Sequence, residues 1–317
     1  MMDIRLLVSR GVFLETGSTR IALDPLVLPR AKPQATFISH AHQDHYSTKV
    51  LRKLSNIVMS RVTRKIIDPK RRLKNVIEVN PGETIEIDGL VVEAFHSGHI
   101  IGSLQFRITL RDAAIVYTGD FNLEKRVVLQ PATPLRGDLI LIDGTYGHPA
   151  YVFPKRREIY ERIISRVKEV AGSGEIVLKS RKLGVAQELT ALISMSTSLP
   201  VIVEPEIARY NEIYEEYGEI LGRYAVSEEP RRGAPLITRL SRRLPRNIPA
   251  IPVTGWALKT GIPLSSHADF SQLVEYVKRS KAQVVVPVCG FREEFSRYIR
   301  ENLGVDSYSG KDISIRL

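Results

Sequence analysis

The segment 40–45, with the sequence His-Ala-His-Gln-Asp-His, restricts what this chain can fold into more than any other feature. Three imidazoles and a carboxylate this close together would compete for protons unless metal ions shared them, and both side-chain types are good ligands for zinc and similar divalent metals. The apolar, β-branched run 35–39 predicts a buried strand before the segment, and Ser47 with the apolar residues after it predicts a capped amphipathic helix. We therefore expect a metal site on a loop between a strand and a helix, the alternative being a solvated polar loop.

Further ligands are expected from other polar interruptions of apolar sequence. The turn 95–103 follows an expected strand at 90–94, so it can aim one of its two histidines at the ions. Asp120 comes just past a buried strand that begins at Ile115, where a lone carboxylate would cost several kcal/mol unless it were paired or bound to a metal. We expect Asp120 to bridge two ions.

These residues resemble the metallo-β-lactamase fold, whose pattern is an Asp at a strand end, a His-x-His-x-Asp-His loop, a later His and a later Asp. In this sequence the pattern falls on Asp24, the segment 40–45, His99 and Asp120. The resemblance implies an α/β protein built as a metallo-β-lactamase αββα sandwich. It also implies that Asp24 orients a ligand rather than being one. Without the resemblance, Asp24 would be a turn carboxylate before Pro25.

The ligand set divides between two ions. His40, His42 and His99 would hold one ion, Asp44 and His45 would hold the other, and Asp120 would bridge them. Two divalent ions are therefore expected, with zinc as the first choice and manganese as the alternative.

Three further segments resemble the β-CASP nucleases, the group within that fold that includes ribonuclease J, the polyadenylation endonuclease and the Artemis-type DNA nucleases. They are 142–147, which resembles an acid-Ser-Thr-Tyr-Gly element, 183–189 and 264–270. The resemblance implies that Asp143 supports His267 and that His267 contacts the scissile phosphate. As an isolated residue, His267 could equally be a core histidine.

The chain departs from full β-CASP enzymes in the size of its insert, because only about a hundred residues separate Gly147 from the expected strand near Val253. This compact form resembles the DNA exonucleases associated with ATP-dependent ligases and archaeal RNA-processing relatives. We expect a metallo-β-lactamase domain in two parts, 1–147 and 254–317, with a small β-CASP-like α/β cap at 148–253 between them.

Cys289, the only cysteine, falls where family members that cut RNA carry a last metal-binding histidine and the Artemis-type enzymes have Val. A thiolate there could complete the shell of the second ion. A free cysteine packed beneath the site is the alternative. The sequence therefore leaves one or two ions open.

The resemblance implies a metal-dependent hydrolase that breaks phosphodiester bonds of nucleic acid. The ions would lower the pKa of water from 15.7 to about 7 and supply a metal-activated hydroxide. Asp44 and His267 are the expected catalytic residues, with His267, oriented by Asp143, binding a phosphate oxygen or protonating the leaving oxygen.

The compact cap and the missing last histidine favour a DNA end-processing exonuclease over an RNA-processing endo- or 5′-exoribonuclease of the mRNA 3′-end processing type. A small-molecule hydrolase of the same fold and a binding protein with a degenerate site are the remaining alternatives. The pair Asp143 and His267 disfavours the former, and the intact segment 40–45 disfavours the latter.

The charge of the chain favours a nucleic-acid substrate. Lys and Arg number 46 against 35 acidic residues, a net charge of +11, and such an excess promotes binding to phosphate backbones through counterion release. Basic clusters at 64–74, 155–157 and 231–246 are candidates, although solvated helix faces are the alternative. Arg181 and Lys182 precede an expected helix whose N-terminus could bind a phosphate.

Sequence patterns also address location and assembly. No apolar run reaches membrane-spanning length, the N-terminus lacks the pattern of a signal peptide, and one cysteine excludes an intrachain disulfide. We expect a cytoplasmic enzyme that does not bind membranes, and a homodimer is left open.

Periodicity gives the expected order of elements. Strands crowd residues 4–144 and are interrupted by the short helix after Ser47; helices then alternate with strands as far as Leu221. The stretch 226–252, rich in Arg, Pro and Ser, is expected to be irregular surface. Helix, strand and helix are expected at 270–280, 283–288 and 293–302.

Overall fold

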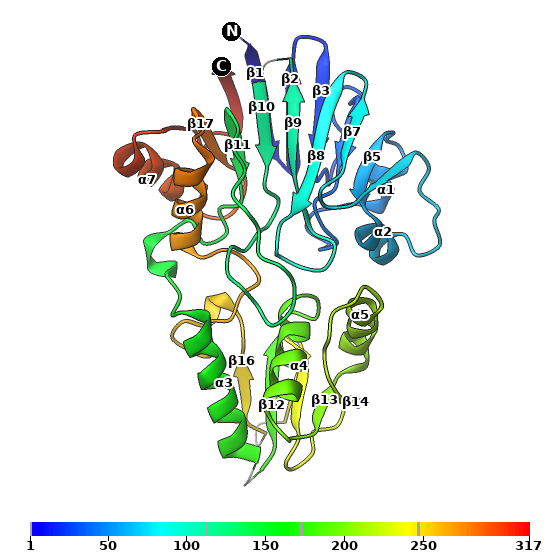
Figure 1. Cartoon of the computed structure of the whole chain (residues 1–317), viewed down its shortest axis with the longest axis vertical. Helices are drawn as coiled ribbons and strands as arrows, with labels where there is room; N and C mark the ends of the chain where they lie inside the picture. Colours follow the sequence, from blue (N-terminus) through cyan, green and yellow to red (C-terminus); the bar gives the residue numbers. More distant parts are fainter. Residues whose placement is uncertain (1, 112, 172–173, 246–247) are drawn as a thin grey trace. The chain divides into compact units, whose positions relative to one another are not determined.

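The computed structural model describes residues 2–111, 113–171, 174–245 and 248–317, which form two compact units (Figure 1). The first unit comprises the chain up to Leu123, Pro131–Ala150 and His267–Leu317. The second comprises Glu124–Gln130 and Tyr151–Ser266. The chain therefore crosses between the units four times.

Two seven-stranded sheets make up the first unit. Sheet A has the order β19 (Asp312–Arg316), β1 (Asp3–Ser9), β2 (Gly11–Thr16), β3 (Thr19–Leu23), β4 (Ala35–Phe37), β5 (Ile57–Ser60), β6 (Val76–Val79). Sheet B has the order β18 (Asp306–Ser307), β17 (Val284–Pro287), β11 (Leu139–Ile142), β10 (Ala113–Tyr117), β9 (Leu104–Leu110), β8 (Leu90–His96), β7 (Thr84–Ile87).

The two sheets pack face to face. In β1 every second residue is buried, which places Ile4, Leu6 and Val8 in one apolar core with side chains of sheet B. The rings of Phe37 from sheet A and Phe106 from sheet B have centroids 5.1 Å apart in this core. The interior of the unit is therefore the space between the sheets.

Helices cover the outer faces. The helices α6 (Phe270–Ser280) and α7 (Arg292–Tyr298), with the π-helical turn Ile299–Leu303 after α7, share a second apolar core with β10, β11 and β17 of sheet B. On sheet A, α2 (Arg61–Ile67) contacts β5 and β6. These layers, helices on sheet on sheet on helices, are the αββα sandwich that the sequence predicted, so that prediction is confirmed.

Two details near the start of the chain differ from expectation. The helix after Ser47, α1 (Thr48–Leu51), is a single turn, and the Ser47 side chain makes no capping hydrogen bond. The helix α2 was not predicted from periodicity, because it has only seven residues; it begins where the Ser60 hydroxyl accepts a hydrogen bond from the backbone N–H of Thr63 at 2.9 Å.

The second unit is built on sheet C, whose strands are all parallel. Its order is β14 (Tyr224–Val226), β13 (Val201–Val203), β15 (Pro235–Arg239), β12 (Ile176–Ser180), β16 (Ala250–Pro252). The helices α3 (Arg156–Ala171), α4 (Val185–Ser196) and α5 (Pro205–Glu216) share an apolar core with this sheet. Short 3₁₀ turns occur at Pro149–Tyr151 and Gly255–Ala257.

The expectation of irregular surface at 226–252 was wrong. This stretch contains β15, a central strand of sheet C, and β16 at its edge. The strand β15 is buried along nearly its whole length, so it lacks the alternation of apolar and polar residues by which a half-exposed strand is recognised. The unit also runs to Ser266 rather than to the expected return near residue 253, because Val253 pairs with Ile262 in a parallel bridge.

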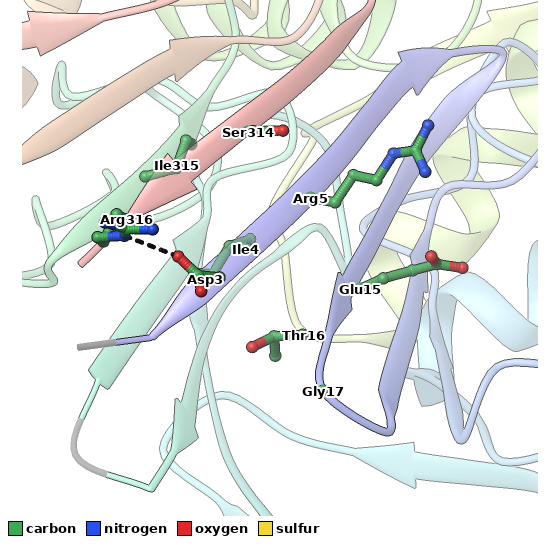
Figure 2. A pocket seen from close by; sticks show the side chains of 9 residues that line it. All are labelled: Asp3, Ile4, Arg5, Glu15, Thr16, Gly17, Ser314, Ile315 and Arg316. Atoms are coloured by element: carbon green, nitrogen blue, oxygen red, sulfur yellow. Dashed lines mark hydrogen bonds and ion pairs between the residues drawn. The ribbon is translucent and has the colours of Figure 1, made fainter.

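The far end of sheet A carries a pocket of about 610 Å³ where β1, β2 and β19 meet (Figure 2). The ion pair between Asp3 and Arg316 at 2.9 Å lies at one side of it, and both side chains are exposed. Gly17, in the turn before β3, lines this pocket, whereas Asp24 follows the opposite end of β3.

Within the part of the chain that the structure describes, none of the helices combines the length and apolar character needed to cross a membrane.

Candidate metal centre

The residues that sequence analysis selected lie at strand ends, and the sheet topology brings those ends together. The strands β3, β4 and β5 are mutually parallel in sheet A, as are β10, β11 and β17 in sheet B, so their carboxyl ends share one edge of each sheet. The residues that follow these ends, and the end of β8, are Asp24, the segment 40–45, His99, Asp120, Asp143 and Cys289.

Four buried side chains, His40, His42, His99 and Asp120, form the tightest group. Nδ1 of His42 lies 3.1 Å from Nε2 of His40 and 3.1 Å from Nε2 of His99, and the Asp120 carboxylate lies 3.5 Å from the same Nε2 atoms. Tetrahedral zinc with bonds of about 2.0–2.1 Å places its ligand atoms about 3.3 Å apart. The donor set and its spacing therefore fit a divalent metal ion.

Protonation states agree with this fit. Burial, and then the neighbouring His45, hold the pKa of His40 well below its ordinary value, so this imidazole is neutral and keeps a lone pair. Burial alone would raise the pKa of Asp120, but His45, His267 and His40 outweigh it and hold that pKa well below its usual range. Burial alone would lower the pKa of His45, but Asp120 and Asp24 outweigh it and hold that pKa well above its ordinary value. The cluster thus presents an ionised carboxylate between a neutral ring, His40, and a ring that favours its cation, His45.

His45 connects Asp120 to Asp24. Its Nε2 lies 3.4 Å from the Asp120 carboxylate and its Nδ1 lies 2.8 Å from Oδ2 of Asp24. Asp24 is buried and forms a second group of possible ligand atoms with His40 and His45. Because Asp24 meets the Nδ1 side of His45, it is placed to orient that ring, the role expected for it.

His267 lies on the other side of Asp120. Its Nδ1 is 3.6 Å from the Asp120 carboxylate and 3.0 Å from Oδ2 of Asp143, and the backbone carbonyl of His267 accepts from Nδ2 of Asn122 at 2.9 Å. Asp143 is fully buried, and its Oδ1 accepts from the backbone N–H of Thr145 at 2.7 Å. The sequence-predicted pair therefore meets directly.

Asp44 and Cys289 stand apart from these groups. Asp44 is exposed and belongs to none of the three clusters of possible ligands among the described residues. The Cys289 thiol donates to Oδ1 of Asp143 at 3.0 Å, and burial, followed by Asp143, raises its pKa well above the ordinary value. Cys289 therefore lies beside Asp143 as a protonated thiol.

The predicted phosphate contacts lie in the second unit. Arg181 is exposed after β12, and the Lys182 ammonium pairs with Glu206 at 3.1 Å. In the basic segment 231–246, Arg239 pairs with Glu204, and Arg246 lies outside the described residues.

Sequence reasoning missed three residues that hold the centre. Ser39 and Tyr117 both donate hydrogen bonds to Asp24, and the Ser97 hydroxyl donates to the backbone carbonyl of Asp120 at 2.7 Å. Ser39 could have been found from its position next to His40. Tyr117 gave no signal, because an aromatic residue in an apolar strand is indistinguishable from core.

The chain matches no protein-family model. It is 28% identical over 309 residues to a probable DNA ligase of Opitutus terrae, an alignment that covers 89% of this chain and 29% of the ligase. It is 26% identical over 228 residues to RNase aCSPSF2 of Saccharolobus solfataricus, covering 63% of this chain and 46% of that protein. This chain thus spans less than half the length of either relative.

Two further likenesses concern part of the sequence and the fold. Cleavage and polyadenylation specificity factor subunit 3-II of Arabidopsis thaliana is 33% identical over 126 residues, which cover 38% of this chain and 20% of that protein. A crystal structure of a protein of unknown function from Enterococcus faecalis superimposes with a TM-score of 0.70 at 15% identity and covers all of both chains. The latter likeness shows the fold alone.

Proposed function

We propose that the chain is a metal-dependent nuclease of the β-CASP type of the metallo-β-lactamase superfamily, and that it processes DNA ends as an exonuclease. The observation that carries the proposal is His267, held by the buried Asp143 and placed 3.6 Å from the Asp120 carboxylate of the metal centre. A general acid beside a site for divalent metal ions is an arrangement suited to phosphodiester hydrolysis.

Two ions are proposed, zinc first and manganese as the alternative. His40, His42 and His99 would hold one, His45 with Asp44 would hold the other, and Asp120 would serve both. Divalent ions in such a site lower the pKa of water towards neutrality and offset negative charge on phosphate oxygens. Since Asp44 is exposed, its side chain would have to turn towards the second ion. The Cys289 thiol, which is hydrogen-bonded to Asp143, is not needed as a ligand.

His267 would act on the substrate directly. Nδ1–H of the ring donates to Asp143, and this fixes the ring orientation and makes Nε2 the atom that faces a phosphate oxygen or the leaving oxygen. In the imidazolium form Nε2–H would donate the proton that the leaving oxygen needs. The Asp143 carboxylate would stabilise that cation by its negative charge without taking up the proton from Nδ1.

The DNA preference rests on how much of the chain each likeness covers. The alignment with the probable DNA ligase includes 89% of the chain, whereas the alignment with the archaeal RNase includes 63%. A nuclease that trims ends would supply a ligase with joinable termini. RNA processing is the second candidate, because RNase aCSPSF2 and an RNase J-like protein of Methanocaldococcus jannaschii match 63% and 67% of this chain.

Arg181, Lys182 and the basic segment 231–246 would contact the phosphate backbone. Those of their cationic side chains that the structure describes are exposed or partly exposed in the second unit, which suits a polyanion, and the net charge of +11 also favours a polyanion. Affinity for an oligonucleotide should therefore fall steeply as salt is raised.

The test is cleavage of end-labelled single- and double-stranded DNA and RNA of one sequence, with zinc or manganese supplied. The His267→Ala variant is the catalytic control, and His96→Ala is its match, because His96 is exposed at the end of β8 and belongs to none of the three ligand groups. Shortening of DNA from its ends by wild type and His96→Ala, but not by His267→Ala, supports the proposal.

Preferential cleavage of RNA would favour the second candidate, an RNA-processing enzyme. The absence of cleavage of every nucleic acid tested would contradict both candidates. A cytoplasmic location and a homodimer remain predictions; fractionation and light scattering would test them.

A further inference from the structure

The Asp24 carboxylate accepts four hydrogen bonds beside the metal centre. Oδ1 accepts from the backbone N–H of Ser39 at 2.7 Å. Oδ2 accepts from the Ser39 hydroxyl at 2.5 Å, from the Tyr117 hydroxyl at 2.7 Å and from Nδ1 of His45 at 2.8 Å. We propose that Tyr117 is a positioning residue that, together with Ser39, fixes Asp24 and through it sets the affinity of the centre for its metal.

Tyr117 is built into the strand that delivers Asp120. It is the last residue of β10, it is 3% exposed, and it pairs with Phe106 on one side and Leu141 on the other, so its backbone cannot move without disturbing both neighbouring strands. Burial, followed by Asp24, raises the pKa of Tyr117 well above its ordinary value, so the hydroxyl remains a donor. A rigid strand thus holds both a proposed ligand and the donor that restrains Asp24.

Ser39 extends the same restraint to a second histidine. Its hydroxyl donates to Asp24 and lies 2.9 Å from Nδ1 of His40, so its lone pair can accept from Nδ1–H. His40 then presents a deprotonated Nε2 towards His42, as a metal ligand must. The absence of a side chain at Gly119 makes room, because a Cβ there would lie 2.5 Å from Cβ of Ser39.

The same logic applies to His45. When Nδ1–H donates to Asp24, Nε2 is left deprotonated and directed at the Asp120 side of the centre, 3.4 Å from that carboxylate. Asp24 therefore sets the tautomer of His45 directly and that of His40 through Ser39. Partners of this kind typically change metal affinity by about 10–100-fold when removed.

The inference rests on the proposed metal centre and is tested by zinc affinity, measured by competition with a chromophoric chelator, rather than by cleavage. We expect Tyr117→Phe to bind zinc about 10–100-fold more weakly than wild type. Tyr276→Phe is the matched control, since Tyr276 is also fully buried and its hydroxyl donates to Oε1 of Gln105 at 2.6 Å, a residue that is not a proposed ligand. The control should bind zinc as wild type does.

The route through Asp24 is tested by a double-mutant cycle. In an Asp24→Ala background, Tyr117→Phe should weaken zinc binding no further. A full additional loss of zinc affinity in this background would overturn the inference. Equal zinc affinities of Tyr117→Phe and wild type would overturn it as well. Should Tyr117→Phe fail to fold, Ser39→Ala carries the same expectation. If wild type itself binds no zinc or manganese, the proposed function fails instead, so the two failures are distinguishable.

Discussion

The ring of His267 and the carboxylate of Asp143 meet with Nδ1 3.0 Å from Oδ2, although Asp143 follows β11 of sheet B and His267 lies just before α6, far away in sequence. Asp143 cannot easily turn away, because its other oxygen accepts from the backbone N–H of Thr145 and from the Cys289 thiol. The imidazole is therefore held by a carboxylate that is itself fixed by two further donors. Such support is what a catalytic histidine needs to keep its orientation.

Removing either partner of this pair should affect catalysis and not folding. We expect His267→Ala to lower kcat by about 100- to 10,000-fold, because a proton donor is lost from the transition state. Asp143→Asn should lower kcat less, since the amide can still orient the ring. Initial rates on an end-labelled DNA duplex and thermal unfolding midpoints would be measured together. Undiminished activity of His267→Ala would refute its assignment.

Cys289→Ala should leave the metal content of the protein unchanged. The thiol donates to Asp143, and among the described residues Cys289 belongs to none of the three groups of possible ligands. Elemental analysis of the purified variant and wild type decides this. His42→Ala, which removes a member of the tightest ligand group, is the comparison and should lose metal. Loss of one ion per chain from Cys289→Ala would instead make the thiolate a ligand.

Sequence reasoning recovered the parts of the centre whose signal is local. The segment 40–45 can be recognised from sequence because its expected ligands are nearly adjacent. Asp120 can be recognised because a carboxylate just after an apolar strand needs a partner. Asp143 and His267 came only from the resemblance, since neither residue is unusual where it stands. Their meeting depends on how α6, which begins just after His267, packs against β11, which Asp143 follows, and no local pattern encodes that packing.

The misses have physical causes of the same kind. The strand β15 was assigned to irregular surface because a strand buried on both faces has no alternation, and its Arg- and Pro-rich flanks resemble loops. Tyr117 was passed over because its hydroxyl matters only through Asp24, a residue on a different sheet. Helix α2 is too short for its periodicity to be visible.

In the second unit, Glu188→Gln should be strongly destabilising. Glu188 is fully buried and accepts from Arg126 and Arg156, each at 2.6 Å, and from the Tyr160 hydroxyl; Arg156 also donates to the backbone carbonyl of Ser265 at 2.9 Å. Neutralising the carboxylate would leave buried guanidinium charge uncompensated, at a cost of roughly 3–5 kcal/mol. Thermal or urea unfolding measures the loss, with the exposed Glu161→Gln as a control that should not change the midpoint.

The stability of the wild type should depend on pH through Glu188, and Glu188→Gln is the comparison. Burial alone would raise the pKa of Glu188, but Arg126 and Arg156 outweigh it and lower the pKa below its unfolded value of about 4.3. The ionised carboxylate therefore stabilises the fold fully above that pH, and the stabilisation is lost as pH falls from about 4.3 through the folded pKa. The unfolding midpoint of the wild type should therefore decrease as the pH is lowered through this window. The midpoint of Glu188→Gln should decrease less. Parallel curves would exclude Glu188 as the titrating group.

Gly290→Ala should destabilise the first unit and disturb the catalytic pair. Gly290 has φ of +63°, and a Cβ there would overlap the carbonyl oxygen of Gly144 and the Cα of Thr145, the residues that directly follow Asp143. Gly304 is the matched control, because its φ of +65° is nearly the same but a Cβ there meets nothing within 4 Å. We expect Gly304→Ala to cost only the left-handed backbone strain, about 1–2 kcal/mol, with cleavage retained. Gly290→Ala should lower the free energy of unfolding by more than this and should lower kcat, because the Gly144 backbone must shift. Equal unfolding midpoints and cleavage rates for the two variants would show that backbone strain alone, and not the contact with Gly144, decides the outcome.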